Sequence, residues 1–249
     1  MWLGIEMISC TIFVIWNDEK KYIDFLESIH KQKDVKYSLV SINNEDNKNF
    51  NSARYAYNSV LHKAEGKYIF FMHPDVIFMD EYALKDVIFE LDKIKEFGIV
   101  GIAGCKDGNK WNIYSNAIHG LNKEKVGISL FEAIEVQTVD ECLFIVNNED
   151  KAFLFSNEPG WHMYSVEECL KNLKIGKKNY VIPVRVWHQS AGNSLDPSYM
   201  KTLENIIDIF GSDFEYINTT VKQWKTRGLR ARLYRKYYYY KQIVKRRLL

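Results

Sequence analysis

A histidine and an aspartate follow an apolar run in the order His73-Pro74-Asp75. The run, residues 68–72, reads YIFFM, which is typical of a buried strand. A carboxylate placed directly after such a strand projects from a rigid element. Together with an imidazole it can hold a divalent cation against a phosphate group. The alternative is a structural turn, which Pro74 and Asp75 would also suit.

A second histidine occupies a comparable position later in the chain. His188 follows the strand-like run 179–187 and opens the polar stretch QSAG. It is therefore a second candidate ligand for the same cation. The alternative is a structural role, which is the more common fate of a lone histidine. Pro183, inside the run, indicates an edge strand or a bulge.

Two groups of carboxylates are candidate general bases. Glu167 and Glu168 fall near the start of a helix expected over residues 163–174, where a base could be held rigidly. The helix dipole also favours carboxylates in a first turn, so simple capping is the alternative. Asp140 and Glu141, between two strand-like runs, form a rival pair.

The first hundred residues alternate between strand-like and helix-like patterns. Apolar runs predict strands, and apolar residues three and four apart predict the helices between them. This order indicates a parallel sheet covered by helices on both faces. Ligands of such sheets bind beyond the carboxyl ends of the strands. The residues expected there form a polar, mostly acidic rim, which includes Trp16, Asn17, Asn43 and Asp75.

Two common phosphate-binding motifs are absent from the sequence. No GxGxxG follows the first predicted strand, and GxxxxGK[ST] does not occur. A bound diphosphate would therefore need another partner, and a divalent cation is the usual one. The segment WNDE after the first strand also lacks the glycines and basic residues with which a nucleotidyltransferase holds a triphosphate.

Residues 56–78, AYNSVLHKAEGKYIFFMHPDVIF, resemble a characteristic stretch of the family 2-like glycosyltransferases with the GT-A fold. Further segments agree in order: TIFVIWNDEKKYIDFLESI, GIVGIAG, VDECLFIV, HMYSVEECL and VIPVRVWHQSAG. The resemblance extends over roughly residues 8–195. It implies an α/β protein whose Rossmann-like, mostly parallel central sheet is flanked by helices.

The resemblance also implies an activity. Members of the family transfer a sugar from a nucleotide-sugar, here expected to be UDP-linked, to a hydroxyl of a glycan or lipid-linked acceptor. Inversion at the sugar and a requirement for Mn²⁺ or Mg²⁺ are expected, within cell-surface polysaccharide or glycoconjugate synthesis. The alternative is a non-catalytic GT-A-like module that binds a nucleotide or a partner.

The resemblance assigns roles to individual residues of this sequence. Asp75 matches the last carboxylate of the metal motif, and His188 matches a later histidine that completes the metal site. Glu167 matches the acidic residue similar to the general base; Asp140, of the rival pair between the strand-like runs, stays the second catalytic candidate on its position alone. His73 stands where many members have an acidic residue and is retained as a metal ligand. The nucleoside pocket would be lined by Trp16, Asn17, Asn43, Ser52 and Asn58, with Asp75 at its end.

Two further departures concern the acceptor side. Ser165 stands where many relatives have aspartate, and Glu141 replaces a frequent glycine.

The charge is divided unevenly along the chain. Of the 34 Lys and Arg residues, 11 lie in residues 221–249, which contain no Asp or Glu. The other 23 are set against 32 carboxylates, so residues 1–220 carry a net charge of −9. We expect a catalytic domain over residues 1–220 and a basic tail over 221–249 that meets an anionic surface.

The tail also has an apolar periodicity. Its large apolar residues recur every three or four positions: Leu229, Leu233, Tyr237, Tyr240, Val244 and Leu248. This pattern predicts an amphipathic helix lying on an anionic membrane. The alternatives are packing on the domain, pairing in a homodimer, or nucleic-acid binding. The acidic remainder of the chain disfavours nucleic acid because it would repel the phosphates.

Other features bear on location. The four cysteines, Cys10, Cys105, Cys142 and Cys169, are widely spaced, which predicts reduced, buried thiols. No uncharged apolar window of ~18 residues exists, so we expect no transmembrane helix. The start MWLGIEMISC lacks a basic segment, so no signal peptide is expected. The expected location is cytoplasmic, peripheral on the inner face of the membrane.

Overall fold

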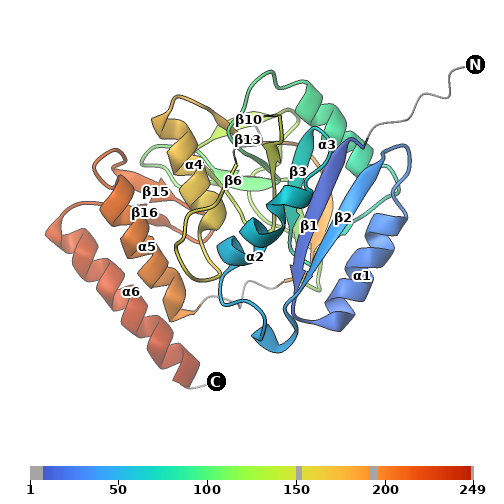
Figure 1. The fold of residues 1–249 in the computed structure, drawn as a ribbon. Coiled ribbons are helices and arrows are strands. Elements are labelled where there is room, and N and C mark those ends of the chain that lie inside the picture. Colours follow the sequence, from blue (N-terminus) through green and yellow to red (C-terminus); the bar gives the residue numbers. More distant parts are fainter. Residues whose placement is uncertain (1–7, 150–152, 191–195, 248–249) are drawn as a thin grey trace, which may run out of the picture.

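A computed structural model describes residues 8–149, 153–190 and 196–247. Its centre is a seven-stranded sheet in the order β10-β13-β5-β12-β3-β1-β2 (Figure 1). The strands are β1 (Cys10–Trp16), β2 (Tyr37–Asn43), β3 (Tyr68–Met72), β5 (Val100–Gly101), β10 (Ile134–Val136), β12 (Leu143–Asn147) and β13 (Asn179–Val181). Only β12 and β10 run against the others within this sheet. The predicted mostly parallel α/β architecture is confirmed.

Helices cover both faces of the sheet because its central strands are apolar on both sides. In β1, Ile12 and Val14 pack beneath α1 (Glu19–His30) and α3 (Ala83–Asp92). Phe13, between them, faces the opposite way, toward α2 (Ala53–Val60) and α4 (Tyr164–Lys174). Successive strand side chains alternate between faces, so each helical layer receives its own apolar core.

Strands outside the large sheet form smaller sheets, mostly from the middle and second half of the chain. The run expected as one strand over residues 179–187 is divided, and Pro183 lies between its two parts. The first part is β13, and the second is β14 (Val186–His188), which joins a sheet ordered β4-β14-β8-β9. Its other strands are β4 (Val76–Phe78), β8 (Ile118–His119) and β9 (Glu124–Lys125). A three-stranded sheet contains β6 (Ala103–Cys105), β7 (Ile113–Ser115) and β11 (Thr138–Val139).

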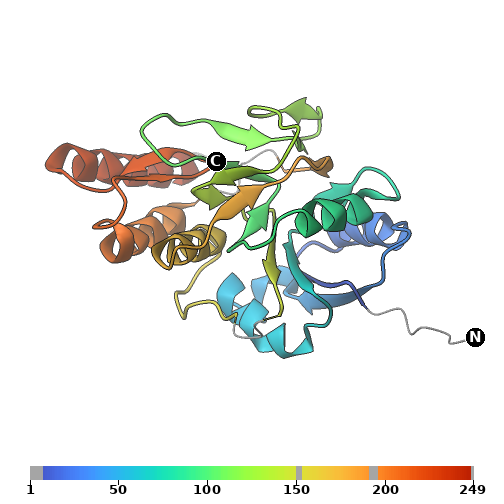
Figure 2. The same ribbon diagram turned by 90° about the horizontal axis from the view of Figure 1, so that it is seen from above.

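The C-terminal part packs beside α4 as further layers. It contains α5 (Pro197–Phe210), the hairpin of β15 (Tyr216–Asn218) and β16 (Gln223–Lys225), and α6 (Leu229–Arg247). Figures 1 and 2 show α4, α5 and α6 side by side at one end of the molecule. Trp224 of β16 is fully buried in a core with α4 and α5. The expected domain boundary at residue 220 therefore falls in the turn of this hairpin.

Two further expectations concern the cysteines and helices that could cross a membrane. All four cysteines are buried, free thiols, as expected. No helix in the described part of the chain is long and apolar enough to cross a membrane.

Candidate active site

A cavity of about 1140 Å³ opens at the carboxyl ends of the parallel strands. Asn17 follows β1, Asn44 follows β2, and His73 with Asp75 follows β3; all four residues line the cavity. This is the edge at which open α/β sheets bind ligands, because successive loops diverge there and leave a crevice. The cavity therefore lies where the sequence predicts it.

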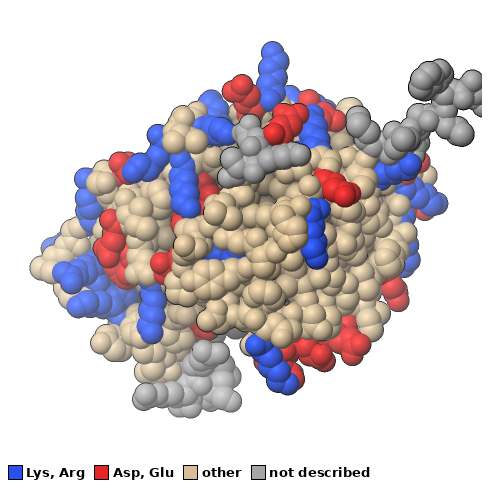
Figure 3. Space-filling view, viewed as in Figure 1, with Lys and Arg blue, Asp and Glu red and all other residues tan. Residues whose placement is uncertain are grey.

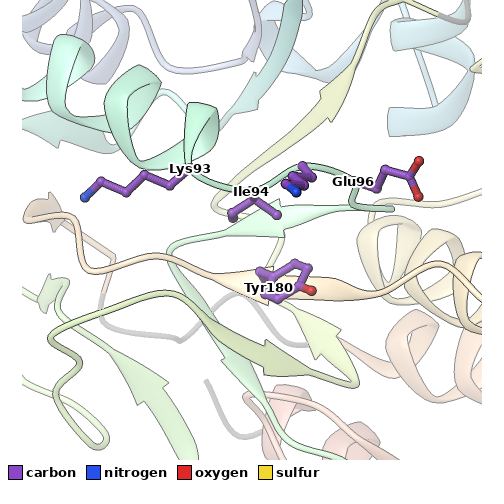
Figure 4. A pocket seen from close by; sticks show the side chains of 5 residues that line it. Lys93, Ile94, Glu96 and Tyr180 are labelled. Carbon is purple, nitrogen blue, oxygen red and sulfur yellow. The ribbon is translucent and has the colours of Figure 1, made fainter.

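A second cavity of about 580 Å³ differs in character. It is lined by residues 93–96 and Tyr180, beyond the end of α3. In Figure 4, Lys93 and Glu96 extend away from one another, while Ile94 and Tyr180 lie between them. These side chains do not form a cluster of converging acidic or imidazole groups. We therefore take the larger cavity as the candidate active site.

Three candidate metal ligands meet in the larger cavity. One ligand atom from each of His73, Asp75 and His188 lies within 4.8 Å of the others. The pairing of β4 with β14 brings them together, since His188 is in register with Val76. The backbone N–H of Gln189 also donates to the Asp75 carbonyl, at 2.8 Å. A contact across more than a hundred residues of sequence is thus set by strand pairing.

Electrostatics favour the ligating forms of Asp75 and His73, whereas a cation would have to displace the proton that Asp75 stabilises on His188. Burial alone would raise the pKa of Asp75, but interactions with the His188 and His73 imidazoles lower it to about 2. Burial lowers the pKa of His73 and so favours its neutral, ligating form. Burial disfavours the protonated form of His188, but the attraction of the Asp75 carboxylate is the larger effect and raises the pKa of His188.

The cluster passes a test of fit for a divalent metal ion. Asp75 Oδ1 is buried and has no hydrogen-bond partner among the described residues; the nearest His188 atom, Nε2, lies 3.5 Å away. A buried carboxylate oxygen without a partner costs free energy unless a ligand satisfies it. One carboxylate and two imidazoles form a donor set that suits a divalent first-row transition metal such as Mn²⁺ better than Mg²⁺, which prefers oxygen ligands.

Asn44 provides a second buried group without a partner. Its Oδ1 accepts hydrogen bonds from the backbone N–H groups of Asn49 and Phe50, at 3.1 and 2.8 Å. Those bonds fix the amide orientation and leave Nδ2 buried without a partner among the described residues. Asn44 is also one of the residues that line the cavity, so this buried donor lies beside it. The residue predicted from the sequence to line the nucleoside pocket is its neighbour Asn43.

The other predicted nucleoside-pocket residues fall into two groups. Asn17 lines the cavity and donates to Asn47 Oδ1 at 3.0 Å. Trp16 stacks on Tyr22, and Asn43 Oδ1 accepts the Glu45 backbone N–H. Neither Trp16 nor Asn43 belongs to the described cavity lining.

Ser52 and Asn58 hold a loop rather than facing the cavity. The Asn58 amide exchanges two hydrogen bonds of 3.0 Å with the backbone of Phe155. Ser52 is fully buried and pairs with Gly160 through an isolated β-bridge. Both residues therefore fasten the segment from 153 to 160 onto α2.

Glu167 is held in a buried ion pair. Its Oε2 accepts from Nε and Nη2 of Arg54, at 3.0 and 2.7 Å, and from Ser156 Oγ at 2.9 Å. Burial alone would raise the pKa of Glu167, but the Arg54 charge, helped by Lys171, lowers it. The described wall of the cavity does not include Glu167. The structure thus places this expected base in a contact between α2 and α4.

Asp140 and Glu141, the rival pair, do line the cavity. Asp140 accepts hydrogen bonds from the Thr220 hydroxyl and the Cys142 backbone N–H. Burial would raise the pKa of Asp140, but His188 and these hydrogen bonds lower it. Glu141 Oε1 accepts the backbone N–H of Tyr164 at 2.7 Å, at the start of α4. Burial and the charge of Asp140 raise the pKa of Glu141 to about 8.

The C-terminal region supplies part of the cavity wall. Thr219, Thr220 and Val221 from the β15–β16 turn line it, as does Tyr238 of α6. Tyr164, whose hydroxyl lies 2.8 Å from His73 Nε2, was also not anticipated. No sequence pattern singles out these residues, because each is brought to the site by packing of distant elements.

Comparison with known proteins identifies the family. The model described as Glycosyltransferase like family matches residues 11–207, so the chain belongs to that family. A curated protein of Fuscovulum blasticum, described as ATP synthase subunits region ORF 6, is 20% identical over 183 residues. That match covers 69% of this chain and 71% of the relative.

Solved structures confirm the fold. The chain is similar to S. aureus TarS 1–349 in complex with UDP-GlcNAc, with TM-score 0.55 and 17% identity over 82% of this chain and 67% of that one. The structure of GalNAc-T7 with UDP, GalNAc and Mn²⁺ is similar with TM-score 0.57 and 10% identity, over 83% of this chain and 48% of that chain. The mannosyltransferase PcManGT of Pyrobaculum calidifontis with GDP-Man and Mn²⁺ is similar with TM-score 0.51 and 12% identity, over 82% of this chain and 64% of that chain. Family and fold together class the chain as a GT-A glycosyltransferase.

Proposed function

We propose that this protein transfers a sugar from a nucleotide-sugar to an acceptor hydroxyl with the help of a divalent cation. The observation that carries the proposal is that two residues lining one cavity each have a buried polar atom that makes no hydrogen bond among the described residues. Asp75 Oδ1 suits a cation, and Asn44 Nδ2 suits a hydrogen-bond acceptor on a nucleoside. A nucleoside diphosphate with its metal ion supplies both partners.

The metal ion would be held by Asp75, His73 and His188. When bound, Mn²⁺ or Mg²⁺ neutralises charge that develops on the departing diphosphate. Asp75 supplies the one negative charge of this cluster, and its low pKa keeps it ionised throughout the physiological range. Asn17 and Asn44 would bind the nucleoside beside it.

Asp140 and Glu141 are the best-placed groups to take the acceptor's proton. Glu141 lines the cavity, and its pKa near neutrality suits a general base. Asp140 is held in place by Thr220 and stays ionised, which favours proton transfer to Glu141. Different environments thus push the two pKa values apart, a pattern typical of acid–base pairs. Glu167 would instead hold α4 to α2.

The finer points follow from the fold relatives and the tail. A UDP-linked hexose is our proposed donor, and the solved TarS complex contains UDP-GlcNAc. The proposed acceptor is a glycan or lipid-linked hydroxyl in cell-surface polysaccharide or glycoconjugate synthesis, with inversion at the sugar carbon. The 11 basic residues of 221–249 support a peripheral location on the inner, anionic face of the membrane.

Calorimetric titration tests the core of the proposal. UDP and GDP are titrated with and without Mn²⁺ into the wild type, Asp75→Asn and Asp24→Asn. Asp24 is an exposed carboxylate of α1 and serves as the matched control. We expect one nucleotide to bind only with Mn²⁺, at least tenfold more weakly in Asp75→Asn and unchanged in Asp24→Asn. Absence of nucleotide binding to the wild type with Mn²⁺ present would overturn the proposal.

The second candidate is a non-catalytic nucleotide-binding module. It is favoured by Ser165, which stands where many relatives have aspartate and donates to the Val139 carbonyl at 2.9 Å. Hydrolysis of UDP-sugars distinguishes the two, because slow donor hydrolysis commonly accompanies transferase chemistry. Metal-dependent nucleotide binding without any turnover, across UDP- and GDP-sugars, would favour the module.

A further inference from the structure

We infer that α6 is a docking surface for an anionic lipid bilayer. The inference deepens the proposed function, since it names the surface at which a lipid-linked acceptor would be met. It rests on three observations about α6: an exposed apolar stripe, a separate packing face, and basic flanks.

The apolar stripe of α6 is exposed along its described length. Five large side chains in this stripe are between 56% and 74% exposed: Leu229, Leu233, Tyr237, Tyr240 and Val244. At ~100° per residue they fall within an arc of roughly 80° on the helix. A continuous apolar stripe of this kind on a surface helix marks an interaction site.

The opposite face of α6 already accounts for its packing on the protein. Arg235 is buried, with Nε 2.8 Å from Glu204 Oε1 and Nη1 donating to the Lys225 carbonyl at 2.6 Å. Tyr238 meets Trp224 edge-on, with ring centroids 5.1 Å apart. The helix is therefore anchored without the stripe, and packing within the chain does not explain those five residues.

Basic side chains border the stripe on both sides. By the same helical geometry, Arg232 and Lys236 lie along one edge, and Arg230 and Lys241 lie along the other. All four are exposed. Figure 3 shows Lys and Arg gathered over the end of the molecule that α6 occupies in Figure 1. A row of apolar groups between two rows of cations is the arrangement of a helix lying in a membrane interface.

These features favour a bilayer over the other partners. A second copy of the chain would bring the basic flanks of two α6 helices together, and like charges repel. A nucleic acid would use the cations but leave the Leu and Val side chains in water. An anionic bilayer accepts both groups, with the tyrosines at the headgroup level.

The packing face of α6 also reaches the cavity. Tyr238, on the side of the helix opposite to the stripe, lines the cavity. The Thr220 hydroxyl, from the hairpin that precedes α6, is hydrogen-bonded to Asp140 in the cavity. The docking helix and the site therefore share their packing, and α6 would lie between the cavity and a membrane bound to the stripe.

Vesicle sedimentation of the full chain tests the inference. The probes are vesicles of phosphatidylcholine alone and of phosphatidylcholine mixed with phosphatidylglycerol. The test variants are Leu233→Ser with Tyr237→Ser, and Arg232→Gln with Lys236→Gln. Phe89→Ser, which removes an exposed aromatic residue from α3, is the matched control.

We expect binding to the mixed vesicles only, weakened by salt and reduced at least tenfold in both double variants but not in Phe89→Ser. Asp75→Asn should bind vesicles like the wild type, so failure of the transferase proposal would leave this result standing. Failure of the wild type to sediment with the mixed vesicles would overturn the inference. So would a stripe-dependent dimer in light scattering, or binding to single-stranded DNA that does not need the stripe.

Discussion

Polar side chains in and beside the cavity differ in whether their polar atoms already make hydrogen bonds. Asn44 Nδ2 and Asp75 Oδ1 are buried and make none among the described residues, whereas both oxygens of Glu167, outside the described cavity lining, accept them or form ion pairs. Glu141 is intermediate, since one oxygen accepts the Tyr164 N–H while burial and Asp140 resist its ionisation. Groups kept in such unfavourable surroundings are typical of functional sites.

Glu141→Gln should lower kcat by about 100-fold or more, because general-base catalysis contributes on that order. Nucleotide affinity should not change, since Glu141 is not proposed to contact the donor. Steady-state kinetics with calorimetry in parallel measures both effects. An unchanged kcat would remove Glu141 from the mechanism.

The same variant should be more stable than the wild type at alkaline pH. Other ionisable groups around Glu141 are Asp140, Arg54, Tyr57, Tyr164 and Tyr199. The pKa of Glu141 rises from 4.5 to about 8 on folding. The unfolded chain therefore binds fewer protons between these values, and the free energy of unfolding falls as pH rises through that window. Glutamine cannot ionise, so the Tm advantage of the metal-free variant should be larger at pH 8 than at pH 5.

Asn44→Ala should weaken UDP or GDP binding by about tenfold, because one hydrogen bond from a fixed buried donor is lost. Asn43→Ala is the matched control. Its side chain serves only a local turn in the described contacts, so nucleotide affinity should stay within about twofold. Calorimetry measures nucleotide affinity in both variants. If Asn43→Ala weakened binding more than Asn44→Ala, the assignment of Asn43 to the nucleoside pocket would be restored.

At the scale of elements, α2 and α4 are joined by a buried charge pair beside the cavity. Arg54 and Glu167 are both almost fully buried, and their side chains come from helices more than a hundred residues apart in sequence. Removal of one partner would leave the other charge buried and unpaired. This contact holds the start of α4, where Tyr164 presents its N–H to Glu141.

Glu167→Ala should lower the free energy of unfolding by about 3–5 kcal/mol, as for other broken buried pairs. Urea denaturation measures the loss. Replacing both partners, with Arg54→Leu and Glu167→Leu, should recover much of it because no charge is then left unpaired. Folded Glu167→Gln should retain most of its kcat. A loss of over 100-fold in kcat with unchanged stability would instead support Glu167 as the base.

At the scale of the whole molecule, the C-terminal region is part of the candidate site and also carries the proposed membrane-docking surface. The β15–β16 hairpin and α6 complete the cavity wall with Thr220 and Tyr238. The same region concentrates the positive charge of an otherwise acidic chain. The tail predicted from composition is thus packed against the catalytic domain in the described structure.

A chain that ends at residue 220 should therefore be severely destabilised. The truncation removes Trp224, and loss of a buried tryptophan side chain alone costs about 3–5 kcal/mol against a total stability of about 5–15 kcal/mol. Circular dichroism during urea unfolding measures the effect. Within the full chain, Arg235→Met should destabilise and the exposed Lys236→Met should not. A truncated chain as stable as the full one would support an independent domain over residues 1–220.

The sequence by itself determined the sheet, its helical layers and the edge that binds the ligand. Those features follow from local apolar periodicity and from the order of strands and helices, which one chain displays directly. It also selected His73, Asp75 and His188 as candidate ligands, since each stands where a strand passes into a polar segment, and the structure brings these three side chains together. The apolar periodicity that begins at Leu229 likewise predicted the helix α6, which the structure describes to Arg247.

Only the tertiary structure decided what each polar side chain faces. A carboxylate looks the same in sequence whether an arginine covers it, as Arg54 covers Glu167, or a cavity lies in front of it, as at Asp140. Asn43 and Asn44 differ by one position, yet only Asn44 is buried with a free donor in the cavity. The apolar stripe of α6 is exposed because Arg235 and Tyr238, on the opposite face of the helix, make its contacts with the rest of the protein. Such contacts join residues far apart in the chain, so their pairing is set by the packed fold and not by local pattern.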